Sequence, residues 1–287
     1  MSSVRVRRSM LFLPGDRVER YPKALASGAD AVCLDLEDGV SFGAKETARG
    51  RALELLAVRE PTRAEIVFRI NDPKTDLGGR DLEALVESGV RPDALVLPKT
   101  AGAEEVRRVE ASLGPKLSGV PLVLMIETAR GVAAAEEIAR ASPNLAFLFF
   151  GAVDLAADVG CALDWDALLY ARSRVIVAAA MAGVETMDAP FLDVSNVNGL
   201  AEESRAVRRL GFTGKAAIHP RQVPIIQQAF SPDDAEIAWA RRIVRAYEDQ
   251  QGGVLLVDGK LVERPVIAAA RRTLAIAEAV AAVSPWP

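Results

Sequence analysis

The sequence of 287 residues has few of the side chains that stabilise secreted domains or build soft-metal sites. It contains two cysteines, Cys33 and Cys161, and one histidine, His219. Two cysteines are too few for a disulfide framework, and they lack the close spacing of a metal site. The single histidine can have no histidine partner. These absences exclude a disulfide-stabilised domain and predict a protein of the reducing cytoplasm.

Long hydrophobic runs and clustered positive charge are missing as well. No apolar run approaches the roughly 20 residues that span a bilayer, and the N-terminal stretch MLFLP, residues 10–14, is too short for a secretion signal. The formal net charge is −4, whereas binding to a nucleic-acid backbone requires clustered Lys and Arg. We therefore expect no membrane and no nucleic-acid partner, but a local cation could still bind an acidic small molecule.

The sequence does contain a regular alternation of apolar runs and helical patterns. Half of its residues are hydrophobic, and the length suits either two domains or one large α/β barrel. Segments with Leu, Ala and Val at helical spacing lie between the runs, and several end in a Gly that caps a helix. The apolar runs, eight in number, cover residues 9–15, 31–38, 65–71, 94–100, 121–128, 145–154, 185–192 and 215–220.

Runs that are apolar on both faces and alternate with helices are typical of parallel strands covered by helices. Eight such units predict a closed (β/α)₈ TIM barrel over residues 1–230. An open doubly wound sheet is the alternative, and its first loop usually carries a Gly-rich phosphate motif. The loop here reads LPGDRVER, residues 13–20, without that motif. The barrel is therefore favoured.

Residues 231–287 follow a different pattern and predict a helix–hairpin–helix extension. The first helix begins near SPDD, with Ser231 as N-cap and Pro232 in the first turn. Alternating residues around Asp258 and Gly259 indicate a hairpin, and an Ala-rich helix follows from Pro265. We expect this extension to form a lid or an oligomer contact.

The active site of a parallel barrel lies at the C-terminal ends of its strands, so the polar residues that finish each apolar run are the candidates. Most of them are carboxylates and arginines. They are Asp16, Arg17, Asp35, Glu37, Asp38, Arg69, Asn71, Lys99, Glu127, Arg130, Asp154, Asp188 and His219.

Glu127 and Asp154 each follow at least four apolar residues, where a charged group is usually paired or metal-bound because its desolvation is costly. Oxygen ligands from two carboxylates suit Mg²⁺, which keeps several waters. The alternative reading is structural: Glu127 pairs with Arg130, and Asp154 caps the next helix. Composition and spacing leave both interpretations open.

The remaining strand-end charges combine binding and structural roles. Arg69 ends a strand and could present its guanidinium to a substrate carboxylate or a developing enolate oxygen, or neutralise core carboxylates instead. In CLDLEDGV, alternation places Asp35 and Glu37 on one face of the strand and Asp38 beyond its end. At least one of these three carboxylates is expected to hold a basic residue such as Lys45 or Arg69.

Seven ordered motifs resemble the family of the citrate lyase β-subunit, malyl-CoA lyase and citramalyl-CoA lyase. They are LFLPGDRVERYPKA, CLDLEDGV, VFRIN, VLPK, MIETARG, GAVDL and GKAAIHPRQV, and they cover almost the whole chain. The resemblance implies a TIM barrel that uses Mg²⁺ to cleave or form a carbon–carbon bond between an acyl-thioester and a 2-oxo acid. Small-molecule partners, an acyl-CoA and a 2-oxo acid, are implied with it.

The resemblance also implies roles for individual residues. Glu127 and Asp154 would be the metal ligands, Arg69 the substrate-oxygen contact, and Arg17 and Lys23 the partners of the CoA phosphates. A loop that leads into a helix can bind a carboxylate with its backbone amides. We therefore expect the amides of Gly151, Ala152, Val153 and Asp154 to hold the substrate carboxylate.

A C-terminal motif in related lyases supplies a proton-transferring aspartate from a neighbouring subunit. The matching stretch here is GKLVERP, so Glu263 takes that place and adds a methylene. An extension that retains a carboxylate implies a homotrimer, or a hexamer, that completes its sites in trans. In related aldolases a histidine follows the acidic motif, but this chain has Asp38 there. His219 is therefore expected to line the thioester channel or to form a hydrogen bond.

Three functions remain open from the sequence. The first is a CoA-ester lyase for citramalyl-CoA or malyl-CoA, which yields acetyl-CoA and pyruvate or glyoxylate. The second is a malyl-CoA thioesterase that uses the same metal site. The third is a citrate lyase β-subunit that acts on a citryl-thioester within a complex. A methyl group alone separates pyruvate from glyoxylate, and a hydrophobic pocket distinguishes such a difference by only about 1–3 kcal/mol.

Overall fold

The computed structural model describes residues 6–250 and 253–283. They divide into two compact units, one of which runs from Arg7 to Gln227, whereas the other begins at Gln228. No helix within the described ranges is long and apolar enough to cross a membrane.

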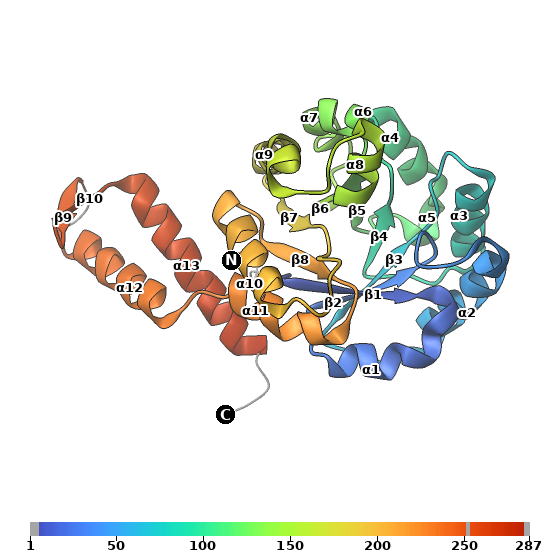
Figure 1. Cartoon of the computed structure of the whole chain (residues 1–287), viewed down its shortest axis with the longest axis horizontal. Helices are drawn as coiled ribbons and strands as arrows, with labels where there is room; N and C mark the ends of the chain where they lie inside the picture. The colour runs from blue at the N-terminus through green and yellow to red at the C-terminus, as the bar shows by residue number, and fades with distance from the viewer. Residues whose placement is uncertain (1–5, 251–252, 284–287) are drawn as a thin grey trace. The chain divides into compact units, whose positions relative to one another are not determined.

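Eight parallel strands form a closed barrel in which each strand pairs with the next and β8 pairs with β1. Figure 1 shows these strands at the centre of a ring of helices. The predicted TIM barrel is thus confirmed. The strands are β1 Ser9–Pro14, β2 Ala31–Asp35, β3 Glu65–Arg69, β4 Ala94–Leu97, β5 Leu122–Ile126, β6 Leu145–Phe150, β7 Glu185–Asp188 and β8 Gly214–Ala217.

Most strands end a few residues before the end of the apolar run that predicts them. The last residues of those runs turn away into loops or helix N-termini, which leaves their polar side chains at the mouth of the barrel. In the run from residue 145 to residue 154, for example, β6 ends at Phe150 and helix α8 begins at Ala152.

The helices follow their strands and cover the outside of the barrel. Many end at a glycine with positive φ, such as Gly89, Gly160 and Gly183, as the sequence predicts. The α-helices of this unit are α1 Tyr21–Ala26, α2 Lys45–Val58, α3 Asp76–Ser88, α4 Ala103–Ser112, α5 Gly114–Leu117, α6 Ala129–Ala133, α7 Ala135–Ile138, α8 Ala152–Val159, α9 Trp165–Ala182, α10 Val197–Leu210 and α11 Val223–Phe230, whose end passes into the second unit. Short 3₁₀ helices are η1 Gly15–Arg20, η2 Phe42–Ala44 and η3 Pro220–Gln222.

Alternate residues of the strands fill the interior of the barrel. Side chains two apart on a strand point to the same face, and the inward positions form one buried cluster that is rich in Val, Met and Phe. Phe12 and Phe149 stack within it, with ring centroids 6.0 Å apart. The interior is therefore a packed core, and any cavity has to lie at one end of the barrel. The cluster comprises Met10, Ala31, Cys33, Val67, Ala94, Val96, Val123, Met125, Phe147, Phe149, Met187 and Ala216, with Phe12 and Ala146 packed against it.

The second unit contains the predicted helix–hairpin–helix. Helix α12 Asp234–Asp249 and helix α13 Arg264–Val283 are linked through the antiparallel strands β9 Leu255–Val257 and β10 Lys260–Val262 (Figure 1). The hairpin turns at Asp258 and Gly259, both with positive φ. A separate apolar core that includes Ala240, Ile243 and Val262 joins these elements.

The predicted N-cap of α12 is wrong by two residues. Asp233, not Ser231, accepts a hydrogen bond from the amide of Glu236 at 2.7 Å, and the Glu236 side chain accepts one from the Asp233 amide at 2.9 Å. This reciprocal capping box fixes the start of the helix. The signal was present in the sequence as Asp233 followed three residues later by Glu236, and it outweighs the Ser-Pro pair before it.

Candidate active site

The inward-facing positions of the barrel continue into its C-terminal mouth. Two residues beyond Cys33, Val67 and Met125 in the core lie Asp35, Arg69 and Glu127, and the same step from Phe149 leads to Gly151. These four residues lie around a cavity of about 340 Å³. Its full lining is Phe12, Pro14, Asp35, Asp38, Gly39, Arg69, Met125, Glu127, Phe149, Gly151, Ala152, Val153, Asp154, Ala189, Pro190 and Ile218.

Glu127 is the most deeply placed carboxylate of the cavity, at 1 % exposure. Its Oε1 accepts a hydrogen bond from the Lys99 amide at 2.6 Å. Burial first, and then the negative charges of Glu37 and Asp154, raise the pKa of Glu127 to about 8. Glycine is required opposite it, because a Cβ on Gly151 would lie only 2.3 Å from Oε2 of Glu127.

Asp154 lies in the first turn of α8, and its side chain remains about one-third exposed to the cavity. Its nearest cation is Lys99, whose Nζ lies 3.4 Å from Oδ1. Arg130 is exposed, and no ion pair joins it to Glu127 in the described part of the chain. The Glu127–Arg130 pair of the structural alternative is therefore not found among the described residues, and a capping role of Asp154 stays a prediction.

Arg69 is held in a fixed orientation by two buried carboxylates. Its Nε and one terminal nitrogen donate to Asp35 at 2.6 and 2.8 Å, and the other terminal nitrogen lies 2.6 Å from Oε2 of Glu37. The guanidinium also lies 4.7 Å above the Phe12 ring. Since a guanidinium has five N–H donors, this arrangement leaves donors for the cavity.

These contacts keep the Arg69–Asp35 pair charged inside the protein. Burial opposes the charge of Arg69, but the carboxylate of Asp35 raises the pKa of Arg69 well above its ordinary value. Burial likewise opposes ionisation of Asp35, but Arg69 holds the pKa of Asp35 below its usual range. For Glu37 burial prevails and raises the pKa. Asp35 and Glu37 thus hold Arg69, one of the two partners expected from the sequence.

The other expected partner, Lys45, does not bind these carboxylates. Its ammonium donates to the carbonyls of Leu36 and Glu37 and to the side chain of Asn71, at 2.6–2.8 Å. Asn71 in turn donates to Asp81 at 2.6 Å. Lys45 and Asn71 therefore fix the loop after β2 and lie outside the cavity lining.

Asp188 and His219, two more strand-end candidates, have local structural roles. Asp188 faces outward from β7 and accepts from Lys215 at 2.6 Å and from Arg172 at 2.9 Å. The Nδ1 atom of His219 accepts from the Arg221 amide at 3.1 Å and so caps the short helix η3. From this segment it is the neighbouring Ile218 that lines the cavity.

The residues expected to contact the thioester or its proton are not among the lining residues of this cavity. Arg17 and Lys23 are exposed in η1 and α1. Glu263 is exposed directly before α13, in the second unit. Their assignments remain predictions.

Two carboxylates at the mouth of a TIM barrel, beside a buried arginine, form the pattern of a metal-assisted lyase or aldolase site. The HpcH/HpaI aldolase/citrate lyase family matches residues 8–220, and a family described as C–C bond lyases of the TIM-barrel fold matches residues 170–281. The chain belongs to the HpcH/HpaI aldolase/citrate lyase family. It is accordingly an enzyme of the carbon–carbon lyase class, of the CoA-ester lyase type.

Relatives of this lyase match nearly its whole length. The citrate lyase subunit beta of Escherichia coli K12 is 35% identical over 96% of this chain and 94% of its own. The mitochondrial citramalyl-CoA lyase of Homo sapiens is 30% identical over 96% of this chain and 86% of its own.

Solved structures support the same assignment. The CitE protein of Mycobacterium tuberculosis, in complex with magnesium, acetoacetate and coenzyme A, is 35% identical with a TM-score of 0.82, covering 95% of this chain and 98% of its own. RipC from Yersinia pestis is 42% identical with a TM-score of 0.71, covering 80% of this chain and 97% of its own.

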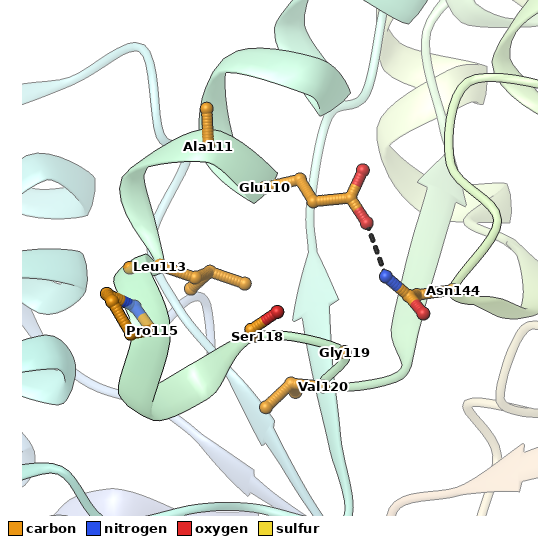
Figure 2. Close-up of a pocket in the computed structure, with 9 residues that line it drawn as sticks. Glu110, Ala111, Leu113, Pro115, Ser118, Gly119, Val120 and Asn144 are labelled. Carbon is orange, nitrogen blue, oxygen red and sulfur yellow. Dashed lines mark hydrogen bonds between the residues drawn. The ribbon is translucent and has the colours of Figure 1, made fainter.

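A second cavity of this lyase, of about 370 Å³, lies near the starts of β5 and β6 and is unrelated to the active site. Its lining residues include Glu110, Ser118 and Asn144, none of which finishes a strand. Figure 2 shows Glu110 and Asn144 pointing toward each other, and Asn144 donates to Glu110 at 2.7 Å. Two of its polar side chains thus bind each other.

Sequence reasoning missed the apolar wall of the active-site cavity. Ala189, Pro190 and Ile218 line it together with Glu127 and Arg69, and none of them stands out in a list of polar strand ends. The alternation of side chains along a strand could have predicted two of them. Ala189 and Ile218 lie two residues beyond the core residues Met187 and Ala216, and so on the same inward face. Lys99 was noted only as a strand-end candidate, with no role assigned.

Proposed function

We propose that this chain is a Mg²⁺-dependent CoA-ester lyase that cleaves, or forms, a small β-hydroxyacyl-CoA such as citramalyl-CoA or malyl-CoA. The products of cleavage are acetyl-CoA and a 2-oxo acid, pyruvate or glyoxylate. The observation that carries the proposal is the pair Glu127 and Asp154 at the cavity beside Arg69. The named relatives, among them a citramalyl-CoA lyase and a CitE bound to magnesium and coenzyme A, support it.

Glu127 and Asp154 fit a hard divalent cation. No group of three or more His, Cys, Asp or Glu that could hold a metal occurs in residues 6–250 and 253–283, so a soft transition-metal site is not favoured. Two carboxylates on a partly open cavity suit Mg²⁺, which keeps waters or substrate oxygens in its other positions. When bound, the ion would lower the pKa of the substrate hydroxyl and neutralise the adjacent carboxylate.

The side chains of the cavity would act on the two ends of the breaking bond. Transfer of the hydroxyl proton to solvent water turns the C–O group into a carbonyl, and the electrons of the C–C bond pass to the thioester as an enolate. The fixed N–H donors of Arg69 would stabilise that enolate oxygen without reorganisation during the reaction. The amides of Gly151 to Asp154, at the N-terminus of α8, would hold the carboxylate of the 2-oxo acid.

Protonation of the enolate methylene then completes acetyl-CoA. We assign this proton to Glu263 of a neighbouring subunit in a homotrimer, and the CoA phosphates to Arg17 and Lys23. The support for these three residues is the resemblance of their motifs to those of the family, together with their exposure to solvent.

The apolar wall favours a 2-oxo acid with a small apolar substituent over a dicarboxylic one. Ala189, Pro190 and Ile218 can pack against a methyl group, whereas a second carboxylate there would lose its hydration without gaining a partner. Arg69 is the one cationic residue that lines the cavity among the described residues, and its remaining N–H donors are the ones proposed for the enolate oxygen. We therefore place pyruvate and glyoxylate ahead of oxaloacetate.

The test is condensation in the reverse direction. Purified protein is incubated with acetyl-CoA or propionyl-CoA, Mg²⁺, and pyruvate, glyoxylate or oxaloacetate, and the CoA products are identified by mass. We expect a condensation product with pyruvate or glyoxylate that EDTA abolishes.

Two variants and one control sharpen this test. Glu127→Gln and Asp154→Asn should lower turnover at least about 100-fold, because each removes a charge from the metal site. Glu104→Gln, which changes an exposed carboxylate on α4, should leave turnover unchanged. Free CoA without any condensation product would instead support the thioesterase. If no pair of substrates reacts and EDTA has no effect, the lyase proposal is wrong.

A further inference from the structure

Lys99 has a backbone conformation that is unusual for a lysine. Its φ is 51°, in the left-handed region that favours glycine, and it follows Pro98 in a turn at the end of β4. A Pro followed by a residue of positive φ is the pattern of a type II turn, where Gly or Asn is the usual second residue. Such a strained residue persists only where its surroundings hold it.

Both polar atoms of the Lys99 backbone are engaged. Its amide donates to Oε1 of Glu127 at 2.6 Å, and its carbonyl accepts from Nζ of Lys74 at 2.8 Å. Lys74 is itself anchored by Glu105 at 2.7 Å. The left-handed turn therefore aims the amide at Glu127.

The side chain of the same residue reaches the other carboxylates of the site. Nζ of Lys99 lies 2.6 Å from Oε1 of Glu37 and 3.4 Å from Oδ1 of Asp154. Glu37 in turn lies 2.6 Å from Arg69. Lys99 thus contacts Glu127 through its backbone and Asp154 through its ammonium, and through Glu37 it is linked to Arg69.

A plain surface ion pair does not account for this arrangement. The Lys99 side chain is only 30 % exposed, and Glu37 only 5 %, so the charges are poorly screened by water. An ion pair alone would also not require a left-handed backbone. The left-handed conformation of Lys99 is explained if its amide and its ammonium have to contact neighbouring carboxylates at the same time.

We propose that Lys99 is a positioning residue that serves as the built-in cation of the metal site. Its amide orients Glu127, and its ammonium compensates the charges of Glu37 and Asp154 until a divalent cation arrives. The ammonium therefore weakens the binding of Mg²⁺ in the absence of substrate. It also keeps a positive charge in the site that can bind the anionic substrate. This inference rests on the proposed function, because it takes Glu127 and Asp154 as the ligands.

The test measures the affinity for Mg²⁺ by calorimetry without substrate. Lys99→Met removes the charge, Lys99→Gly removes the charge and also suits the left-handed backbone, and Lys99→Arg retains the charge. Since a unit charge within a few ångströms acts strongly at low screening, Met and Gly should each bind Mg²⁺ about tenfold more tightly, and Arg within about twofold of the unchanged protein. Equal or weaker binding by both Met and Gly would overturn the proposal.

Two controls separate the outcomes. Lys116→Met removes an exposed ammonium from α5, and it should leave the Mg²⁺ affinity unchanged; a tenfold gain there would also overturn the role of Lys99. If the unchanged protein binds Mg²⁺ and Glu127→Gln does not, the metal site stands whatever the Lys99 variants show. If the unchanged protein binds no Mg²⁺, both proposals are wrong.

Discussion

At the scale of single residues, the neighbours of a buried carboxylate decide its protonation state. Asp35 and Glu127 are both almost fully buried, yet their pKa values shift in opposite directions. Asp35 is paired with Arg69, and its pKa is lowered, whereas Glu127 faces other carboxylates, and its pKa is raised to about 8. The neighbours, and not the residue type, therefore determine which carboxylate retains a proton near neutral pH.

This raised pKa of Glu127 predicts a pH dependence of stability in EDTA. At a pH below 4.5, the ordinary pKa of a glutamate, Glu127 is protonated in both the folded and the unfolded chain, so its contribution to the free energy of unfolding is fully present. As the pH rises to about 8 the unfolded chain releases this proton first, so Glu127 lowers the free energy of unfolding by up to roughly 4 kcal/mol. Urea unfolding from pH 5 to 8 measures this loss.

The matched comparison is Glu127→Gln, which cannot titrate. The stability of this variant relative to the unchanged protein should rise steadily between pH 5 and 8. Parallel pH curves for the two proteins would show that Glu127 is ionised at ordinary pH and that its burial is compensated in another way.

At the scale of the elements, the period of two along each strand sorts strand-end residues by role. Asp35, Arg69 and Glu127 continue the inward series and line the cavity, whereas Asp188 lies one position out of that series and faces the helices. A list of polar strand ends cannot make this distinction, because it records that a residue ends a strand and not which way it points. The core residues Cys33, Val67 and Met125 show which positions of each strand point inward.

Outward-facing charges join neighbouring elements, and burial sets their energetic importance. Lys215 of β8 is fully buried and binds Asp188 at 2.6 Å and Glu203 at 2.7 Å. Arg174 pairs with Glu136 at the same 2.6 Å, but both side chains are about 30 % exposed. The two contacts differ in their exposure to solvent but hardly in their distance.

We expect Lys215→Met to lower the free energy of unfolding by about 3–5 kcal/mol, because it removes one of the two cations that bind the fully buried carboxylate of Asp188. Arg174→Met should cost under about 1 kcal/mol, since water screens an exposed pair. Urea unfolding of both variants at pH 7 gives the comparison. Similar losses in the two variants would mean that contact distance matters more here than burial.

At the scale of the whole molecule, the barrel unit contains the proposed metal ligands and Arg69, whereas Glu263 belongs to the second unit. The proposal that a neighbouring subunit supplies Glu263 therefore predicts complementation between two inactive variants. Neither Glu263→Ala nor Glu127→Gln should turn over alone. Subunits of the two variants, mixed under conditions that exchange them, should form some sites with both residues intact.

Activity that returns in the mixture in proportion to such sites, measured by condensation, would support action in trans. Size-exclusion chromatography with light scattering should give a trimer, or a hexamer, for each variant. A mixture that stays inactive although its subunits exchange, or a Glu263→Ala variant with full activity by itself, would contradict the role of Glu263.

The sequence by itself determined the barrel, the family motifs and the strand-end carboxylates, because these depend on local pattern: runs apolar on both faces, glycine at helix ends, and charges that follow apolar residues. Only the tertiary structure decided that Asp35 and Glu37 hold Arg69, that Asp188 and His219 serve local structure, and that Lys99 joins Glu127 to Asp154. Those contacts link residues that lie up to 55 positions apart in sequence, as Lys99 and Asp154 do. Closure of the barrel brings such residues together, and neither the direction of a side chain nor its solvent screening can be read from its neighbours in the chain.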